Sequence, residues 1–211
     1  MSIFSVKSFY RFLHPKFQNL FSEYKVEFKP RWGHGKAGHP ELLNLIDQHR
    51  SEYALLLEEA LTYKEKFWEI KSCSESKDEL DPCWNNGFLP GLDIVGIYTM
   101  LAHYKPKKYI EIGSGNSTKV AYKAKKENSL NTKIISIDPE PRAQIDQLAD
   151  EIIRQPFENI NLDLTEELEP GDILFVDNSH RILPNSDAMV FFLEVLPKLK
   201  KGVIVHIHDI Y

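Results

Sequence analysis

The stretch that decides the fold is YIEIGSGNSTKVA, residues 109–121. It begins as an apolar strand, turns at Gly113 and Gly115, and continues in a pattern typical of a helix. Glycine lets the backbone turn tightly and lets a ligand approach it closely. Asn116 and Ser117 suit the start of a helix, whose free N–H groups favour a negatively charged ligand. We therefore expect a strand–turn–helix unit with a ligand site at the turn.

Further apolar runs follow this unit and alternate with helical patterns. Strands are predicted over Lys107–Ile112, Lys133–Ile137, Ile152–Gln155, Asp172–Val176 and Gly202–His208. Helices are predicted over Ser117–Glu127, Arg142–Glu151 and Ser186–Leu199. Buried strands that alternate with helices indicate a parallel sheet with right-handed crossovers. The predicted fold class is α/β, a Rossmann-like doubly wound parallel sheet.

The chain before this pattern reads as a helical segment, so we expect domains at residues 1–83 and 84–211. Apolar residues from Phe9 to Tyr24 share a helical face and Lys7 and Arg11 are nearby, a pattern that suits a membrane surface or packing on protein. We favour packing over a membrane, and expect the segment to form a substrate lid or a homodimer interface. Pro40 opens a further helical stretch that runs to about Ile70.

Composition excludes several classes of protein. The 26 basic and 31 acidic residues give a net charge of −5, without the basic excess that duplex nucleic acid requires. No apolar run approaches the ~18 residues that cross a bilayer. Cys73 and Cys83 form neither a CxxC motif nor a zinc-type spacing, and no signal peptide is evident. We therefore expect a reduced, cytoplasmic protein without disulfides.

The second strand ends at Asp138, 23 residues after Gly115, where an acid can accept hydrogen bonds from a ribose diol. Both a nicotinamide dinucleotide and S-adenosylmethionine contain a ribose. The dinucleotide fingerprint GxGxxG has Thr118 at its third glycine position here. A methionine carboxylate needs less glycine surface than a pyrophosphate, and Glu111 is placed to bind the methionine ammonium. These points favour S-adenosylmethionine.

Four motifs, YIEIGSGNSTKVA, IISIDPEPR, GDILFVDNSHR and LPKLKKGVIVHIHDIY, together resemble class I S-adenosylmethionine-dependent methyltransferases. The chain looks closest to the group known as methyltransferase domain 24, over Trp84–Tyr211. The resemblance implies a cofactor site. In it, the methionine part would be surrounded by Glu111, Gly113, Ser114, Gly115, Asn116 and Ser117, and the ribose would be held by Asp138 beside Pro139. Pro156 and Phe157 would lie near the adenine, and Asn86 would belong to a segment that closes over the cofactor.

The same resemblance implies methyl transfer to a small molecule but does not identify the acceptor. We favour O-methylation of a hydroxyl group, for example of a sugar or other polyol. His180 is the candidate general base, because imidazole titrates near neutral pH, and Asp177 is placed to orient it. Metal-dependent O-methyltransferases hold Mg²⁺ with acids at the positions of Asp177 and Asp209. Here Ile210 follows Asp209, so the match to that pattern is incomplete.

Two other functions fit the same sequence. One is a methyltransferase-like module that binds the cofactor without catalysis, and the other is an NAD-dependent oxidoreductase. Thr118 and the absence of an evident Tyr-x-x-x-Lys catalytic pair on a later helix argue against the oxidoreductase. Related folds add two strands after the fifth, whereas this sequence ends at Tyr211. We therefore expect a sheet that lacks the last two strands and has the fifth strand at an edge.

Overall fold

The computed structural model describes residues 6–21, 23–27 and 29–209. The final motif thus lies within the described residues except for Ile210 and Tyr211. Contacts divide the chain into two compact units, 1–44 and 45–211. The boundary that the sequence suggests at residues 83 and 84 stays a prediction.

The larger unit contains a five-stranded parallel sheet with the order β3-β2-β1-β4-β5. The strands are β1 Lys108–Ile112, β2 Lys133–Ile137, β3 Glu151–Ile153, β4 Ile173–Val176 and β5 Ile204–Ile207. This confirms the predicted Rossmann-like α/β fold, and every strand end lies within two residues of its expected position. From β1 the chain builds outward through β2 and β3, then returns to add β4 and β5 on the other side. The order therefore reverses between β1 and β4, the usual place for a ligand site.

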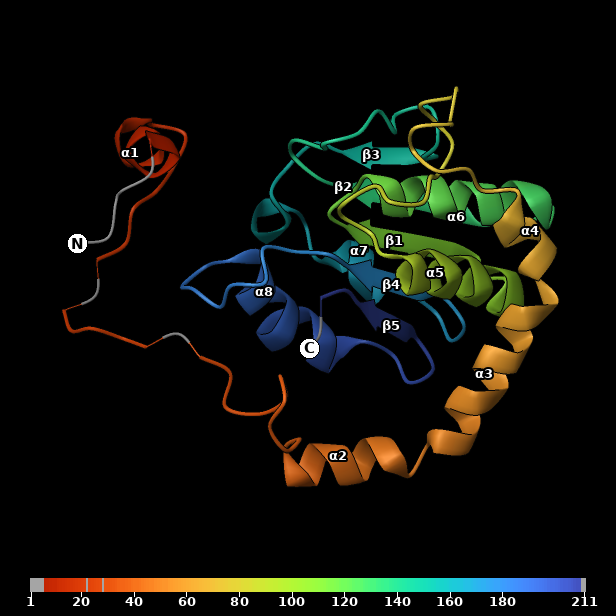
Figure 1. Ribbon diagram of the computed structural model, residues 1–211, viewed down its shortest axis with the longest axis horizontal. Helices are drawn as coiled ribbons and strands as arrows, with labels where there is room; N and C mark the ends of the chain where they lie inside the picture. The colour runs from red at the N-terminus through yellow and green to blue at the C-terminus, as the bar shows by residue number, and fades with distance from the viewer. Residues whose placement is uncertain (1–5, 22, 28, 210–211) are drawn as a thin grey trace. The chain divides into compact units, whose positions relative to one another are not determined.

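Helices cover both faces of the sheet. Helix α5 (Gly91–Tyr104) and helix α6 (Asn116–Glu127) lie side by side on one face (Figure 1). The other face packs against α7 (Asp163–Glu166), α8 (Asp187–Val190), the 3₁₀ turn η1 (Phe157–Asn159) and the π-helical η2 (Phe191–Val195). The 3₁₀ turn η3 (Leu196–Lys198) follows η2. Successive residues of a strand point to opposite faces of the sheet and pack into different cores: Tyr109 packs with α5 and α6, and Ile110 packs with η2. Burial of these two apolar cores holds the strands in place, and with them the polar residues that follow the strand ends.

Two of the predicted helices are wrong. Residues 142–150 form turns, because Asp150 is tied to β2: its carboxylate accepts a 2.8 Å bond from the Ile134 N–H, and its own N–H donates to the Ile134 carbonyl. This pairing holds Asp150 beside β2, directly before β3, so the residues before it do not form a complete helix.

The helix predicted over 186–199 begins as α8 but continues as the π-helical η2 and the 3₁₀ turn η3. Pro197 lacks the N–H that a continuing α-helix requires.

The N-terminal helices are short. Helix α1 (Val6–Leu13) ends before Pro15, and α2 (Pro40–Asp47) begins at the proline that predicts it. The single stretch expected from there to Ile70 is divided into α2, α3 (Arg50–Thr62) and α4 (Lys64–Trp68). None of the helices within the described residues is both long and apolar enough to cross a bilayer.

The expectation of free cysteines is also wrong, because Cys73 and Cys83 form a disulfide. The Cys73 N–H donates to the Trp84 carbonyl at 3.1 Å, and the Trp84 N–H donates to the Lys71 carbonyl at 2.9 Å. These bonds turn the chain back on itself and bring the two Cα atoms to 4.9 Å. The sequence spacing alone does not reveal this turn.

Candidate functional site

The turn after β1 approaches the end of β4 closely. Gly113 has φ +83°, a conformation that favours glycine, and its N–H donates to the Ile137 carbonyl at 2.9 Å. A Cβ at Gly113 would lie 2.0 Å from the carbonyl oxygen of Asp177. Glycine at this position therefore lets the β1 turn and the first residue after β4 share one site.

Glu111 lies beneath this turn, with none of its surface exposed. Its carboxylate accepts hydrogen bonds from the hydroxyls of Ser117, at 3.0 Å, and Thr118. The Thr118 hydroxyl in turn accepts the Gly115 N–H at 3.1 Å. Burial raises the pKa of Glu111 to about 7, although the two hydroxyl donors act to lower it. The carboxylate thus fixes the first turn of α6, and contact with a methionine ammonium stays a prediction.

Asp138 connects the ends of β1 and β2. One carboxylate oxygen accepts the Ser114 N–H at 2.9 Å, and the other accepts the Glu140 N–H at 2.8 Å. Arg154 also donates to the Asp138 carbonyl at 3.1 Å. These bonds orient the carboxylate at the carboxyl edge of the sheet, where the predicted ribose site lies. Its ligand remains untested.

A cavity of about 260 Å³ lies against the turn. Six of the predicted site residues line it: Asn86, Ser114, Gly115, Asn116, Ser117 and Asp177. Its other lining residues are Cys73, Cys83, Phe88, Leu89, Arg142 and Ala143. Glu111, Gly113, Asp138, Pro139, Pro156 and Phe157 do not line it, and Phe157 packs in the core with only 3% of its surface exposed. The cavity thus joins the glycine turn to Asp177 and to a segment before α5.

Asp177 belongs at the same time to a cluster of two acids and two histidines. In it, His180 Nε2 lies 3.1 Å from Asp177 Oδ1 and 3.4 Å from Asp209 Oδ2. His208 Nδ1 lies 3.3 Å from the same Asp177 oxygen and 3.6 Å from Asp209 Oδ1. One potential ligand atom from each of the four residues lies within 4.8 Å of the others. The cluster can hold a proton or a cation.

His208 is the member of this cluster to which the sequence analysis assigns no role. Only 2% of its side chain is exposed, and its Nε2 faces the Asp93 carboxylate at 3.6 Å. The hydrogen bond that His208 Nδ1 donates to the Asp177 carboxylate raises the pKa of His208. Partial burial acts to raise the pKa of Asp177, but His208 and His180 outweigh it and lower that pKa. The one available sequence signal was position: His208 directly precedes Asp209 at the end of the last strand.

His180 and Asp209 reach the cluster through unusual backbone conformations. Their φ angles are +56° and +57°, in the left-handed region that non-glycine residues rarely adopt. Such conformations cost roughly 1–3 kcal/mol each and persist where surrounding contacts hold them. The loop that carries His180 is held by Asp187, whose carboxylate accepts the Ser179 N–H at 2.8 Å. The protein thus maintains both side chains in place despite the local cost.

Two comparisons with known proteins bear on this site. Residues 110–210 match a family model described as a methyltransferase domain. A protein of Archaeoglobus fulgidus, described only as uncharacterized, is 33% identical over 95 residues, which cover 42% of this chain and 43% of that protein. The match thus spans less than half the length of this relative.

Proposed function

Because residues 110–210 match the model of a methyltransferase domain, we propose that this chain is a class I S-adenosylmethionine-dependent methyltransferase that methylates a hydroxyl group of a small molecule. In this proposal S-adenosylmethionine binds in the cavity between Asn86 and the Ser114–Ser117 turn. The acceptor binds beside Asp177, where the cavity meets the cluster of acids and histidines.

The observation that carries the proposal is that one cavity contacts both the start of α6 and Asp177. The first N–H groups of a helix have no partner within the helix and favour an anion such as the methionine carboxylate. The cluster beside them is suited to take up a proton. A bound cofactor and a hydroxyl acceptor would thus meet at the reversal point of the sheet.

S-adenosylmethionine supplies an activated methyl group when bound, so the chain's task is to position the acceptor and accept its proton. As the acceptor oxygen forms its bond to the methyl carbon, the carbon–sulfur bond breaks and S-adenosylhomocysteine leaves. We assign uptake of the hydroxyl proton to His180 Nδ1, because Nε2 faces the carboxylates of Asp177 and Asp209 and can contact them only as a hydrogen-bond donor. These two carboxylates then stabilise the imidazolium that results.

The same cluster supports a second candidate role, the binding of a divalent cation. The sequence suggests Mg²⁺ at Asp177 and Asp209, but the geometry adds His180 and His208 as donors. Imidazole suits transition metals, whereas Mg²⁺ prefers oxygen ligands. A cation here would polarise the acceptor hydroxyl in place of a histidine base. Titration of chelator-treated protein with Mn²⁺ and Mg²⁺ by calorimetry tests this role, and heat from neither ion would exclude it.

The cofactor is tested by thermal shift with S-adenosylmethionine, S-adenosylhomocysteine and NAD in parallel. A ligand at 100 times its dissociation constant adds about 2.7 kcal/mol of stability, enough for a shift of several degrees. We expect shifts with both sulfur ligands and none with NAD. A shift with NAD alone would indicate an oxidoreductase. No shift with any of the three would contradict the proposed cofactor.

Catalysis is tested with Asp177→Asn in a screen of hydroxylated acceptors that measures release of S-adenosylhomocysteine. The substitution removes the charge that stabilises protonated His180 and His208. We expect turnover to fall by roughly 100-fold, with affinity for S-adenosylhomocysteine nearly unchanged. Asp163→Asn on the exposed surface of α7 is the control and should retain turnover. Cofactor binding without transfer to any acceptor would support the non-catalytic module instead.

A further inference from the structure

The Cys73–Cys83 disulfide lies at the proposed cofactor cavity. Both cysteines line it, with Ser114, Gly115 and Asn116 of the β1–α6 turn among the other lining residues. Cys73 is exposed to solvent and Cys83 is half-buried. The cross-link is therefore both part of the cavity wall and within reach of a dissolved reductant.

Hydrogen bonds extend this cross-link along the wall. The Asn86 amide donates to the carbonyls of Cys83 and Leu89, both at 3.0 Å. Its oxygen accepts the N–H groups of Phe88 at 2.9 Å and Leu89 at 2.7 Å. The Phe88 ring in turn lies 5.1 Å from the guanidinium of Arg142, another lining residue. A movement of Cys83 would therefore be transmitted through Asn86 to the segment that borders the cofactor.

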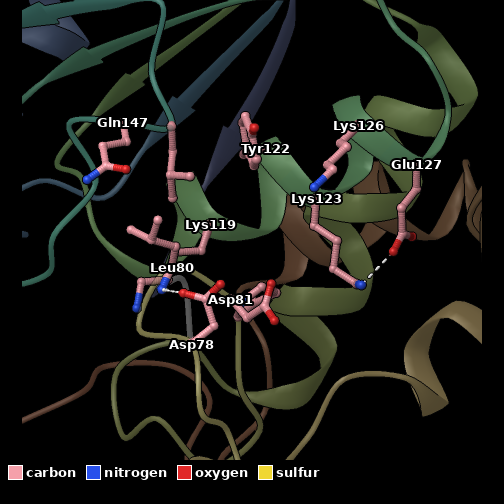
Figure 2. A pocket seen from close by; sticks show the side chains of 11 residues that line it. Asp78, Leu80, Asp81, Lys119, Tyr122, Lys123, Lys126, Glu127 and Gln147 are labelled. Atoms are coloured by element: carbon pink, nitrogen blue, oxygen red, sulfur yellow. Dashed lines mark hydrogen bonds and ion pairs between the residues drawn. The ribbon is translucent and has the colours of Figure 1, made fainter.

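Besides the disulfide, the loop between the cysteines is held by local hydrogen bonds, such as those that the Glu75 and Ser76 N–H groups donate to the Ser72 carbonyl, both at 3.0 Å. Pro82 is the one buried residue between the cysteines. The loop also borders a second cavity, of about 490 Å³, whose lining includes Asp78 and Asp81 of the loop and Lys119 and Lys126 of α6 (Figure 2). Among the described residues, no ion pair joins these two acids to the lysines of α6. The disulfide therefore supplies much of the constraint on this loop.

We propose that the Cys73–Cys83 disulfide positions the wall of the cofactor cavity, and that its reduction by a dithiol weakens cofactor binding. This inference rests on the proposed function for the identity of the cofactor. With the bond intact, the wall from Cys83 to Leu89 is ordered before the cofactor arrives. With the bond broken, the cofactor must order that wall as it binds, which lowers its affinity.

The chemistry is ordinary thiol–disulfide exchange. A thiolate of the dithiol attacks one sulfur of the pair, the Cys73–Cys83 bond breaks, and a mixed disulfide forms. The second thiol of the reductant then attacks that mixed disulfide and leaves as a cyclic disulfide. Both protein sulfurs end as thiols, so two electrons and two protons pass to the protein. Reoxidation reverses these steps.

The test compares oxidised and dithiothreitol-reduced full-length protein, with a thiol count to confirm each state. Calorimetry measures the affinity for S-adenosylhomocysteine, and hydrogen exchange measures protection of the Phe88 and Leu89 amides. We expect reduction to weaken binding at least tenfold and to speed exchange at these amides, while the amides of α5 are unaffected. The double variant Cys73→Ser/Cys83→Ser should match the reduced protein and be insensitive to dithiothreitol.

The two readouts separate this inference from the function on which it rests. Equal affinity and equal exchange in the two redox states would overturn the inference. A dithiothreitol effect that persists in the double variant would also overturn it. If the oxidised protein does not bind S-adenosylhomocysteine but reduction still speeds exchange, the proposed cofactor is wrong and redox control of the wall stands.

Discussion

Glu111 is a carboxylic acid that combines complete burial with two hydroxyl donors from α6. Its pKa is raised by burial to about 7, above the value near 4.5 that it has when exposed. A raised folded-state pKa gives stability that is complete below the unfolded pKa and is lost as pH rises through the folded pKa. The free energy of unfolding should therefore lose a contribution from Glu111 between about pH 4.5 and pH 7.

The substitution Glu111→Gln tests this dependence because it removes the charge and keeps an oxygen that accepts a hydrogen bond. The gap in unfolding free energy between the wild type and Glu111→Gln should shift by roughly 3 kcal/mol, in favour of the variant, from pH 5 to pH 8. Urea denaturation at four pH values measures it. The exposed Glu65→Gln on α4 is the control. A gap that is constant with pH would show that Glu111 stays ionised throughout.

At the scale of elements, the site depends on how closely the β1–α6 turn approaches the end of β4. A Cβ at Gly113 would lie 2.0 Å from the Asp177 carbonyl, which is backbone and cannot rotate away. Gly113→Ala should therefore destabilise the protein by about 3 kcal/mol or more, or displace Asp177 from its cluster. Urea denaturation measures the loss of stability. Loss of S-adenosylhomocysteine binding in a variant that still folds would report the displacement.

The matched control is Gly96→Ala, inside α5. Its Cβ would meet His206 Cε1 at 3.7 Å, an ordinary contact. Because alanine is the better helix former, this variant should be unchanged or more stable by up to about 1 kcal/mol. Comparable destabilisation in both variants would mean that the close approach at Gly113 is not what limits substitution.

The sheet was predictable from the sequence, and the connections between its strands were less so. Apolar runs such as residues 133–137 need burial on both faces, and this alone indicates a central parallel strand. The helix expected at 142–151 fails because one long-range contact, from Asp150 to Ile134, overrides local helix propensity. The sequence pattern of residues 142–151 by itself does not indicate this contact.

The same distinction holds at the site. Ser114 to Ser117 and Asp177 were found because glycine turns and strand-end acids mark the carboxyl edge of a sheet. The role of His208 and the disulfide were not predicted, because each depends on a contact that the local sequence pattern does not indicate. His208 joins Asp177 across 31 residues of chain, and Cys83 meets Cys73 through the turn at Trp84. Chemistry at the end of one strand is readable from sequence, and chemistry between strands requires the fold.

At the scale of the whole molecule, the described residues in the first quarter of the chain include no buried side chain. Among the described residues the first buried one is Ala60, and Phe67 and Ile70 follow in the core around α5. The Phe67 ring lies 5.3 Å from that of Tyr98, which is almost fully buried. A stable α/β domain should therefore need α4 as well as the sheet, which places its start before the boundary expected at residue 84.

Two deletions test where this domain begins. Removing residues 1–39 takes away no buried side chain among those described, so the melting temperature and the urea m-value should be nearly unchanged. Removing residues 1–70 also takes away Phe67 and Ile70 and exposes Tyr98 to solvent. By analogy with large core truncations, this should cost about 3–5 kcal/mol. If the shorter protein were as stable as the full chain, the core around α5 would not depend on α4 and the boundary at residue 84 would stand.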